Sequence, residues 1–233
     1  MADVITLGAR QDATLYENVA GMAASGAGTG MFVGKIARGG LIRRSLISFD
    51  VAGSIPAGST ITRVELTLSV TRSAGSSLNI GLHRLLAGWG EGASDAGAPA
   101  GGGGVTPESG DATWIHRFFG GAAWTNPGGD FVAAASATRG FGGVGTYTYA
   151  SSAGSVADVQ AWLNTPGANY GWLLKGPETQ NGNARRIATH EEPIAALRPR
   201  LLIEYTPIPA PAACAPLLVL AAMRRRRREP LTE

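Results

Sequence analysis

The chain has 233 residues, of which 34 are glycine and only 16% are charged, and this composition favours a loop-rich β protein. It carries 20 basic and 17 acidic side chains. Five of the basic residues are the arginines of 224–228, and two of the acidic residues are the glutamates that follow them. The chain up to residue 206 therefore carries 15 basic and 15 acidic side chains. This neutral body excludes nucleic acid as a partner, because a nucleic-acid-binding domain needs its own basic face to neutralise phosphate.

Alternating apolar and polar residues predict strands along most of the chain. In chain order they are expected at 12–17, 31–36, 44–51, 62–70, 77–85, 145–151, 170–176 and 199–206. In 62–70 the buried face is expected to carry Val64, Leu66, Leu68 and Val70, and the exposed face Arg63 and Glu65. So many short strands, separated by turn residues, predict an all-β fold consisting of a single β-sandwich.

Two segments interrupt the strand pattern. Residues 155–167 place Val156, Val159, Trp162 and Leu163 at helical spacing, with Ser155 as the expected N-cap. They predict one short helix at an end of the sandwich, with Trp162 in the core. The glycine-rich residues 90–111 predict a long surface loop, and loops of that length are often functional or mobile.

Seven segments occur in a defined order between Val4 and Thr206. They are QDATLYEN, RRSLISFDVAGSIPAGSTITRVELTLSVT, HRLLAGWGEG, GDATWIHRFF, WTNPGGDF, DVQAWLNTPGANYGWLLKG and ARRIATHEEPIAALRPRLLIEYT. Together they resemble a DNRLRE domain, a family of secreted bacterial and archaeal domains, many attached to polysaccharide-active or cell-surface proteins. The resemblance implies a jelly-roll sandwich over residues 1–206, similar to the alginate-binding carbohydrate-binding modules. Arg185, Arg186 and His190 match the basic pattern near that family's last-but-one strand.

The chain is expected to bind rather than to catalyse. It has three histidines and neither a Gly-x-Ser-x-Gly elbow nor a phosphate loop. Aromatic faces stack on sugar rings, so a shallow surface for acidic polysaccharide is expected at Trp124, Arg185, Arg186 and His190. The alternatives are a structural or adhesive surface protein without a small-molecule site, and a polysaccharide-active enzyme.

Acidic residues in and beside the glycine-rich loop raise a second expectation, a metal site. Carboxylate oxygens are ligands that Ca²⁺ prefers, and the candidates here are Glu91, Asp95, Asp111 and Asp130. The competing interpretation is that these side chains only face water.

Residues 207–233 are expected to form a separate tail. Three prolines precede an apolar run at 212–223 and a fourth, Pro216, lies within it. The run is shorter than the roughly 20 residues that span a bilayer. With the arginines of 224–228, the tail is similar to a PEP-CTERM sorting signal, which implies transient membrane association, processing by an exosortase and a cell-surface or extracellular location. Residues 1–18 lack the pattern of a signal peptide, so this location requires one that the sequence does not include. The alternatives are a disordered basic tail and a cytoplasmic protein.

Overall fold

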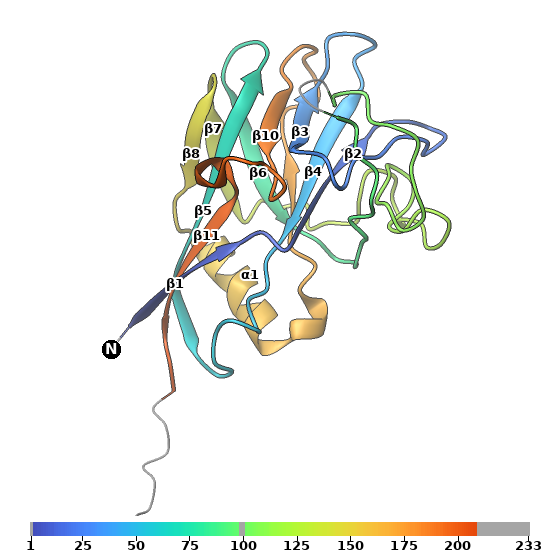
Figure 1. Ribbon diagram of the computed structural model, residues 1–233. Coiled ribbons are helices and arrows are strands. Elements are labelled where there is room, and N and C mark those ends of the chain that lie inside the picture. Colours follow the sequence, from blue (N-terminus) through green and yellow to red (C-terminus); the bar gives the residue numbers. More distant parts are fainter. Residues whose placement is uncertain (1, 98–100, 209–233) are drawn as a thin grey trace, which may run out of the picture.

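The computed structural model describes residues 2–97 and 101–208, so the prediction for the tail lies almost wholly outside the described residues (Figure 1). Within them the fold is all-β, with eleven strands and one α-helix. The strands are β1 Asp3–Gly8, β2 Gln11–Tyr16, β3 Gly30–Lys35, β4 Ile42–Ser48, β5 Thr60–Ser73, β6 Leu78–Arg84, β7 Ala137–Phe141, β8 Gly145–Tyr149, β9 Trp172–Lys175, β10 Arg185–Ala188 and β11 Arg200–Thr206. The helix, α1, is Ala153–Asn164, and two 3₁₀ turns follow at Pro166–Ala168 and Ala195–Leu197.

The strands form one antiparallel sheet that curls into two layers. In the first layer β5 pairs along one edge with β11 and β10 and along the other with β8, and β1 extends the layer beyond β11. The second layer follows the order β2, β4, β9, β6, β7. Strand β3 joins the two layers, because Gly30–Val33 pair with β10 while Gly34 and Lys35 pair with β4. Gly34 has φ +108°, a conformation that glycine adopts without strain, at the point where the strand changes partner.

The main hydrophobic core lies between the layers. On β5, Val64, Leu66, Leu68 and Val70 are at most 2% exposed. Arg63 is exposed and Glu65 is half-buried on the opposite face, which confirms the predicted register. A slip of one residue would have turned the apolar set toward solvent.

A second hydrophobic cluster covers the outer face of the second layer. It contains Leu46 and Leu173, whereas their neighbours Ile47 and Trp172 belong to the main core. The cover comes from the chain between β6 and β7, residues 85–136, called here the long connection, which forms the lobe on the right of Figure 1. Strands β4 and β9 are therefore buried on both faces.

Helix α1 begins one residue after Ser152, so the predicted N-cap at Ser155 was wrong. The Ser152 side chain accepts a hydrogen bond from the Ser155 backbone N–H, and the Ser155 hydroxyl accepts one from the backbone N–H of Ser152. This reciprocal arrangement satisfies two donors that a helix start leaves free. Trp162 is 1% exposed and lies in the core, as predicted.

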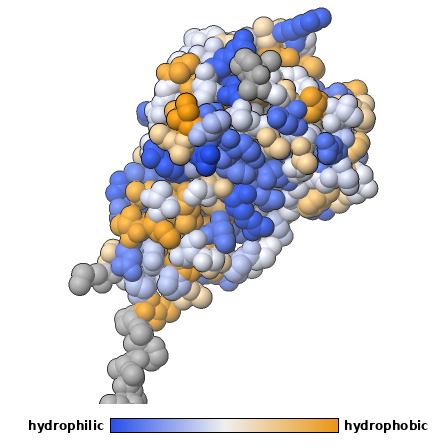
Figure 2. Space-filling model, viewed as in Figure 1, coloured by the Kyte–Doolittle hydropathy of each residue, from blue (hydrophilic) through white to orange (hydrophobic). Residues whose placement is uncertain are grey.

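The described parts of the glycine-rich loop run along the surface beside β2 and β4. The Tyr16 hydroxyl donates to the carbonyl of Gly101, and Nε of Arg43 donates to that of Gly102. On the face shown in Figure 2, hydrophobic residues lie in small groups among hydrophilic ones. Within residues 2–97 and 101–208, no helix has the length and apolar character needed to cross a membrane.

Candidate functional site

Trp124 does not lie on a binding surface. It is 5% exposed, and it packs in the second hydrophobic cluster with Trp89 and Trp114, while its indole N–H donates to the carbonyl of Thr113 at 2.9 Å. The expectation that Trp124 stacks on a sugar is therefore corrected. The long connection uses its tryptophans to cover the apolar outer face of β4 and β9, and that burial takes precedence over exposure to a ligand.

Arg185 is also unavailable to a ligand, since it is fully buried. Its guanidinium donates to the carbonyls of Gly142 at 2.8 Å and Asn183 at 2.9 Å, and also to those of Ala74 and Ser76. A buried guanidinium needs such acceptors, and here they are the backbone of three neighbouring loops. The expected sugar contact at Arg185 is replaced by a role in holding those loops together.

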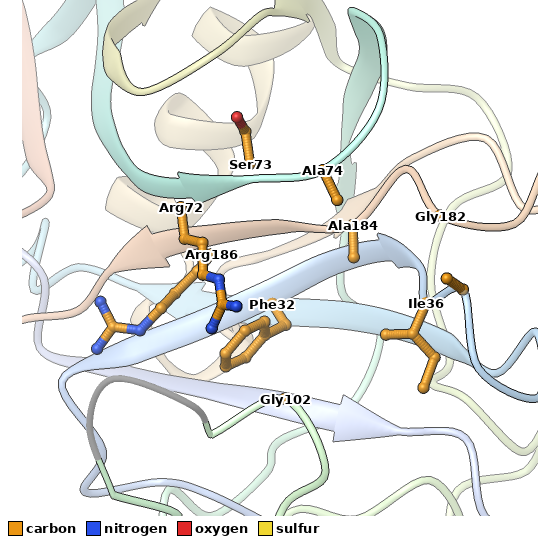
Figure 3. Close-up of a pocket in the computed structure, with 10 residues that line it drawn as sticks. Phe32, Ile36, Arg72, Ser73, Ala74, Gly102, Gly182, Ala184 and Arg186 are labelled. Carbon is orange, nitrogen blue, oxygen red and sulfur yellow. The ribbon is translucent and has the colours of Figure 1, made fainter.

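Arg186 lies at a concavity on the first layer, called here the arginine pocket. Its volume is about 230 Å³, and Figure 3 shows its walls between the end of β5, the end of β3 and the loop before β10. The lining residues are Phe32, Ile36, Ala37, Arg72, Ser73, Ala74, Gly102, Gly182, Ala184 and Arg186. Gly30 leaves room for one wall, because a Cβ there would lie only 2.3 Å from Nε of Arg186.

Positive charge collects at this pocket. Arg186 is 8% exposed and donates to the hydroxyls of Thr71 and Thr29, both at 2.7 Å, while its Nε has no partner. Arg72 is exposed. Arg43 is only 3% exposed, and its guanidinium carbon lies 4.9 Å from the centroid of the Tyr16 ring. Its Nε donates a hydrogen bond to the carbonyl of the pocket residue Gly102.

None of these three arginines forms an ion pair with a carboxylate in the described part of the chain. Burial lowers the pKa of Arg186 and that of Arg43, because a charged guanidinium loses hydration there. Of the three arginines only Arg72 is exposed, so it is the cation at this pocket that an anion from solvent can reach directly.

His190 belongs to a different site, called here the acidic cluster, with Asp12, Glu91 and Glu191. One ligand atom from each of the four side chains lies within 4.8 Å of the others. Nδ1 of His190 lies 3.2 Å from Oδ2 of Asp12 and 3.5 Å from Oε1 of Glu91, and its Nε2 lies 3.0 Å from Oε1 of Glu191. The four residues come from β2, the long connection and the segment after β10.

The charges in the acidic cluster shift one another's protonation. The hydrogen bond to Asp12 raises the pKa of His190 to about 9, against the opposing effect of burial. Burial raises the pKa of Glu91 to about 7 and also raises those of Asp12 and Glu191, because the carboxylate forms lose hydration. Metal-free, the cluster therefore holds protons at pH values where isolated carboxyl groups would not.

The four expected calcium ligands do not meet at one place. Only Glu91 enters the acidic cluster. The Asp95 carboxylate accepts a hydrogen bond from the backbone N–H of Gly97, and the Asp111 carboxylate accepts one from the backbone N–H of Glu108. The Asp130 carboxylate accepts hydrogen bonds from the backbone N–H groups of Thr125 and Asn126. These three carboxylates stabilise turns within their own loops.

In comparisons with known proteins, no protein-family model and no curated protein matches the chain.

Sequence reasoning missed Arg72, Asp12 and Glu191 as site residues. Asp12 lies in β2, which is buried from Asp12 to Tyr16, and a buried carboxylate needs a partner. The sequence QDATLY does not reveal this burial, because three of its six residues are polar. Arg72 occupies an alternating position at the end of β5, and only the pairing of β5 with β10 places it beside Arg186.

Proposed function

We propose that the chain is a non-catalytic domain of the cell surface or extracellular matrix that binds an acidic polysaccharide through the arginine pocket. The observation that supports this is that Arg72 and Arg186 line one concavity and Arg43 bonds to its lining residue Gly102. None of the three pairs with a carboxylate in the described residues. Guanidinium groups present several N–H donors in a fork that fits carboxylate and sulfate groups. Such groups distinguish acidic sugars from neutral ones.

The three arginines have different parts in this proposal. Arg72 is exposed and is the group that contacts the ligand. Arg186 and Arg43 are held by threonine hydroxyls and backbone carbonyls, so they supply a fixed positive field at little further cost in side-chain entropy. Phe32, 6% exposed, gives the pocket an apolar wall.

The location is part of the proposal and rests on the resemblance to DNRLRE domains and on the composition of the tail. In this proposal the arginines of 224–228 hold the exported chain briefly at the membrane until an exosortase processes it. Intact-mass measurement of the protein from its host tests this part. A mature species still ending in Glu233 would count against it.

Isothermal titration of the full chain with uronic-acid oligomers and with neutral glucan oligomers of equal length tests the binding. We expect the uronic-acid oligomers to bind and the neutral ones not to. Raising the salt from about 0.05 M to about 0.5 M should weaken the binding, since mobile ions screen exposed charges.

The decisive variant is Arg72→Ala, because the side chain of Arg72 is exposed and forms no hydrogen bond or ion pair to another described residue, whereas its backbone belongs to the pairing of β5 with β10. Losing one charge-assisted hydrogen bond should weaken uronic-acid binding about tenfold or more. Arg139→Ala removes an equally exposed arginine from β7 and should leave the affinity within about twofold, on the scale of a distant surface charge. Absence of binding would instead favour a structural or adhesive protein without a small-molecule site. Equal loss in both variants would contradict the arginine pocket as the place of binding.

A further inference from the structure

The acidic cluster has the composition of a metal site. Three carboxylates and one imidazole converge from segments as far apart in sequence as Asp12 and His190. Three of the four residues are partly exposed, with side-chain exposures of 31% for His190, 20% for Glu91 and 23% for Glu191. An ion therefore has a path from solvent to the cluster.

A second observation comes from the buried member. Asp12 is 0% exposed, and its Oδ1 has no hydrogen-bond partner, although its Oδ2 accepts the backbone N–H of His190 at 2.9 Å. Oε2 of Glu191 is likewise buried without a partner. Buried polar atoms are nearly always satisfied in folded proteins, and an unpaired carboxylate oxygen is among the most costly to leave alone. The oxygens that contact His190 are the other two, Oδ2 of Asp12 and Oε1 of Glu191. A cation that binds both oxygens of these carboxylates supplies the missing partners.

We propose that Asp12, Glu91, His190 and Glu191 bind one divalent transition-metal ion of the Zn²⁺ type. Imidazole nitrogen and carboxylate oxygen together suit Zn²⁺, whereas Ca²⁺ takes six to eight oxygen ligands. Bonds of 2.0–2.2 Å in a tetrahedron place neighbouring ligand atoms about 3.4 Å apart. The distances from Nδ1 of His190, 3.2 Å to Asp12 and 3.5 Å to Glu91, already lie near that value. Glu191 lies 3.0 Å from Nε2 on the other side of the ring, so its side chain has to turn toward the ion.

The proposed ion has a structural role. It ties β2, the long connection and the segment after β10 together at one point, because each contributes at least one ligand. Four protein ligands fill a tetrahedral site, and closed sites of this kind stabilise folds rather than activate water. This inference does not depend on polysaccharide binding at the arginine pocket.

Metal content and affinity of the full chain test the proposal. The protein is treated with a chelator, loaded with Zn²⁺ at about pH 8, where binding of the ion displaces the protons that the ligands still hold, passed through gel filtration and assayed for retained metal. We expect one Zn²⁺ per chain, a melting temperature that rises with Zn²⁺ concentration, and weaker binding of Ca²⁺ in parallel calorimetric titrations.

Three variants locate the ion. Glu91→Gln keeps a carbonyl oxygen to accept the Asp12 backbone N–H, and His190→Gln keeps a polar group of similar reach. Each should weaken Zn²⁺ binding at least about tenfold, as loss of metal-site interactions does. Glu108→Gln changes an exposed glutamate of the same loop region and should bind as the wild type does.

Circular dichroism of the metal-free variants checks that they fold. If His190→Gln does not fold, the Zn²⁺ affinity of Glu91→Gln alone tests the proposal. Wild-type protein that retains no stoichiometric Zn²⁺ would overturn the proposal. Wild-type affinity in a folded Glu91→Gln variant would do so too, because the ion would then lie elsewhere, and preference for Ca²⁺ over Zn²⁺ would overturn the choice of metal.

Discussion

Replacing Asp158 should destabilise the protein by more than an ordinary change on a helix. Asp158 lies on α1 and is 8% exposed. Its Oδ2 accepts the indole N–H of the fully buried Trp172 at 2.7 Å and the hydroxyl of Ser136, and its Oδ1 pairs with Arg84 at 3.2 Å. One carboxylate therefore ties the helix to β9, to β6 and to the end of the long connection.

The size of the effect follows from these contacts. Asp158→Ala leaves the Trp172 donor buried without an acceptor, which costs about 1–3 kcal/mol, and removes the Ser136 bond, worth about 1 kcal/mol. The Arg84 side chain is 38% exposed, so its pair adds only about 0–1 kcal/mol. Alanine returns about 0.5 kcal/mol through its higher helix propensity. We expect a net loss of about 2–4 kcal/mol in the free energy of unfolding.

Urea denaturation with a double-mutant cycle measures this. Asp158→Asn keeps an oxygen acceptor for Trp172 and should lose only about 1 kcal/mol. In a Trp172→Phe background, which removes the donor, Asp158→Ala should cost about 1–3 kcal/mol less than in the wild type. A cost that is the same in both backgrounds, or a single variant within about 0.5 kcal/mol of the wild type, would refute the reasoning.

Three further predictions concern stability. Leu68→Ala, at a fully buried position of the main core, should lower the free energy of unfolding by about 2–5 kcal/mol. The control Arg63→Ala should change it by about 0.5 kcal/mol at most, and urea denaturation measures both variants. Ser152→Ala removes the N-cap of α1 and should cost about 1 kcal/mol in the same assay, and no loss would contradict its capping role.

The third prediction concerns stability in acid. Burial alone would raise the pKa of Glu178. Two hydrogen bonds from Arg44, at 2.8 and 3.1 Å, and the charge of Arg44 instead lower this pKa below the ordinary 4.5. The lowered pKa contributes stability that is present above about pH 4.5 and is lost as the pH falls through the folded-state value. Glu178→Gln should therefore flatten the acid limb of a stability curve measured from about pH 6 to pH 3, and an unchanged limb would contradict this.

Local pattern was enough for eight of the eleven strands and for the buried face of β5. In β5 the alternation of apolar and polar residues has one solution that buries the apolar set, so register and face follow directly from the sequence. The helix around Trp162 was predicted for the same kind of reason, although its N-cap was misplaced by three residues because Ser152 and Ser155 are both good capping residues. Strands β1, β7 and β10 were not predicted. In β7, ATRGF shows no alternation of apolar and polar residues.

The sites depended on tertiary structure, because each combines residues that the sequence separates widely. Trp124 lies beside turn residues, a context that suggests exposure, yet the outer face of β4 and β9 needs an apolar cover. The unbroken apolar residues of WLLK in β9 are typical of a strand buried on both faces, and they were the sign that such a cover exists.

By itself, therefore, the sequence determined the all-β class, the buried face of β5 and the neutrality of the body, because periodicity and composition are local properties. Only the tertiary structure decided which charged residues meet. Arg186 and His190 are four residues apart, yet the pairing of β10 with β3 and β5 places one beside Arg72, and the turn after β10 places the other against Asp12 of β2. Pairing between distant strands sets those contacts, and no local preference of the chain encodes them.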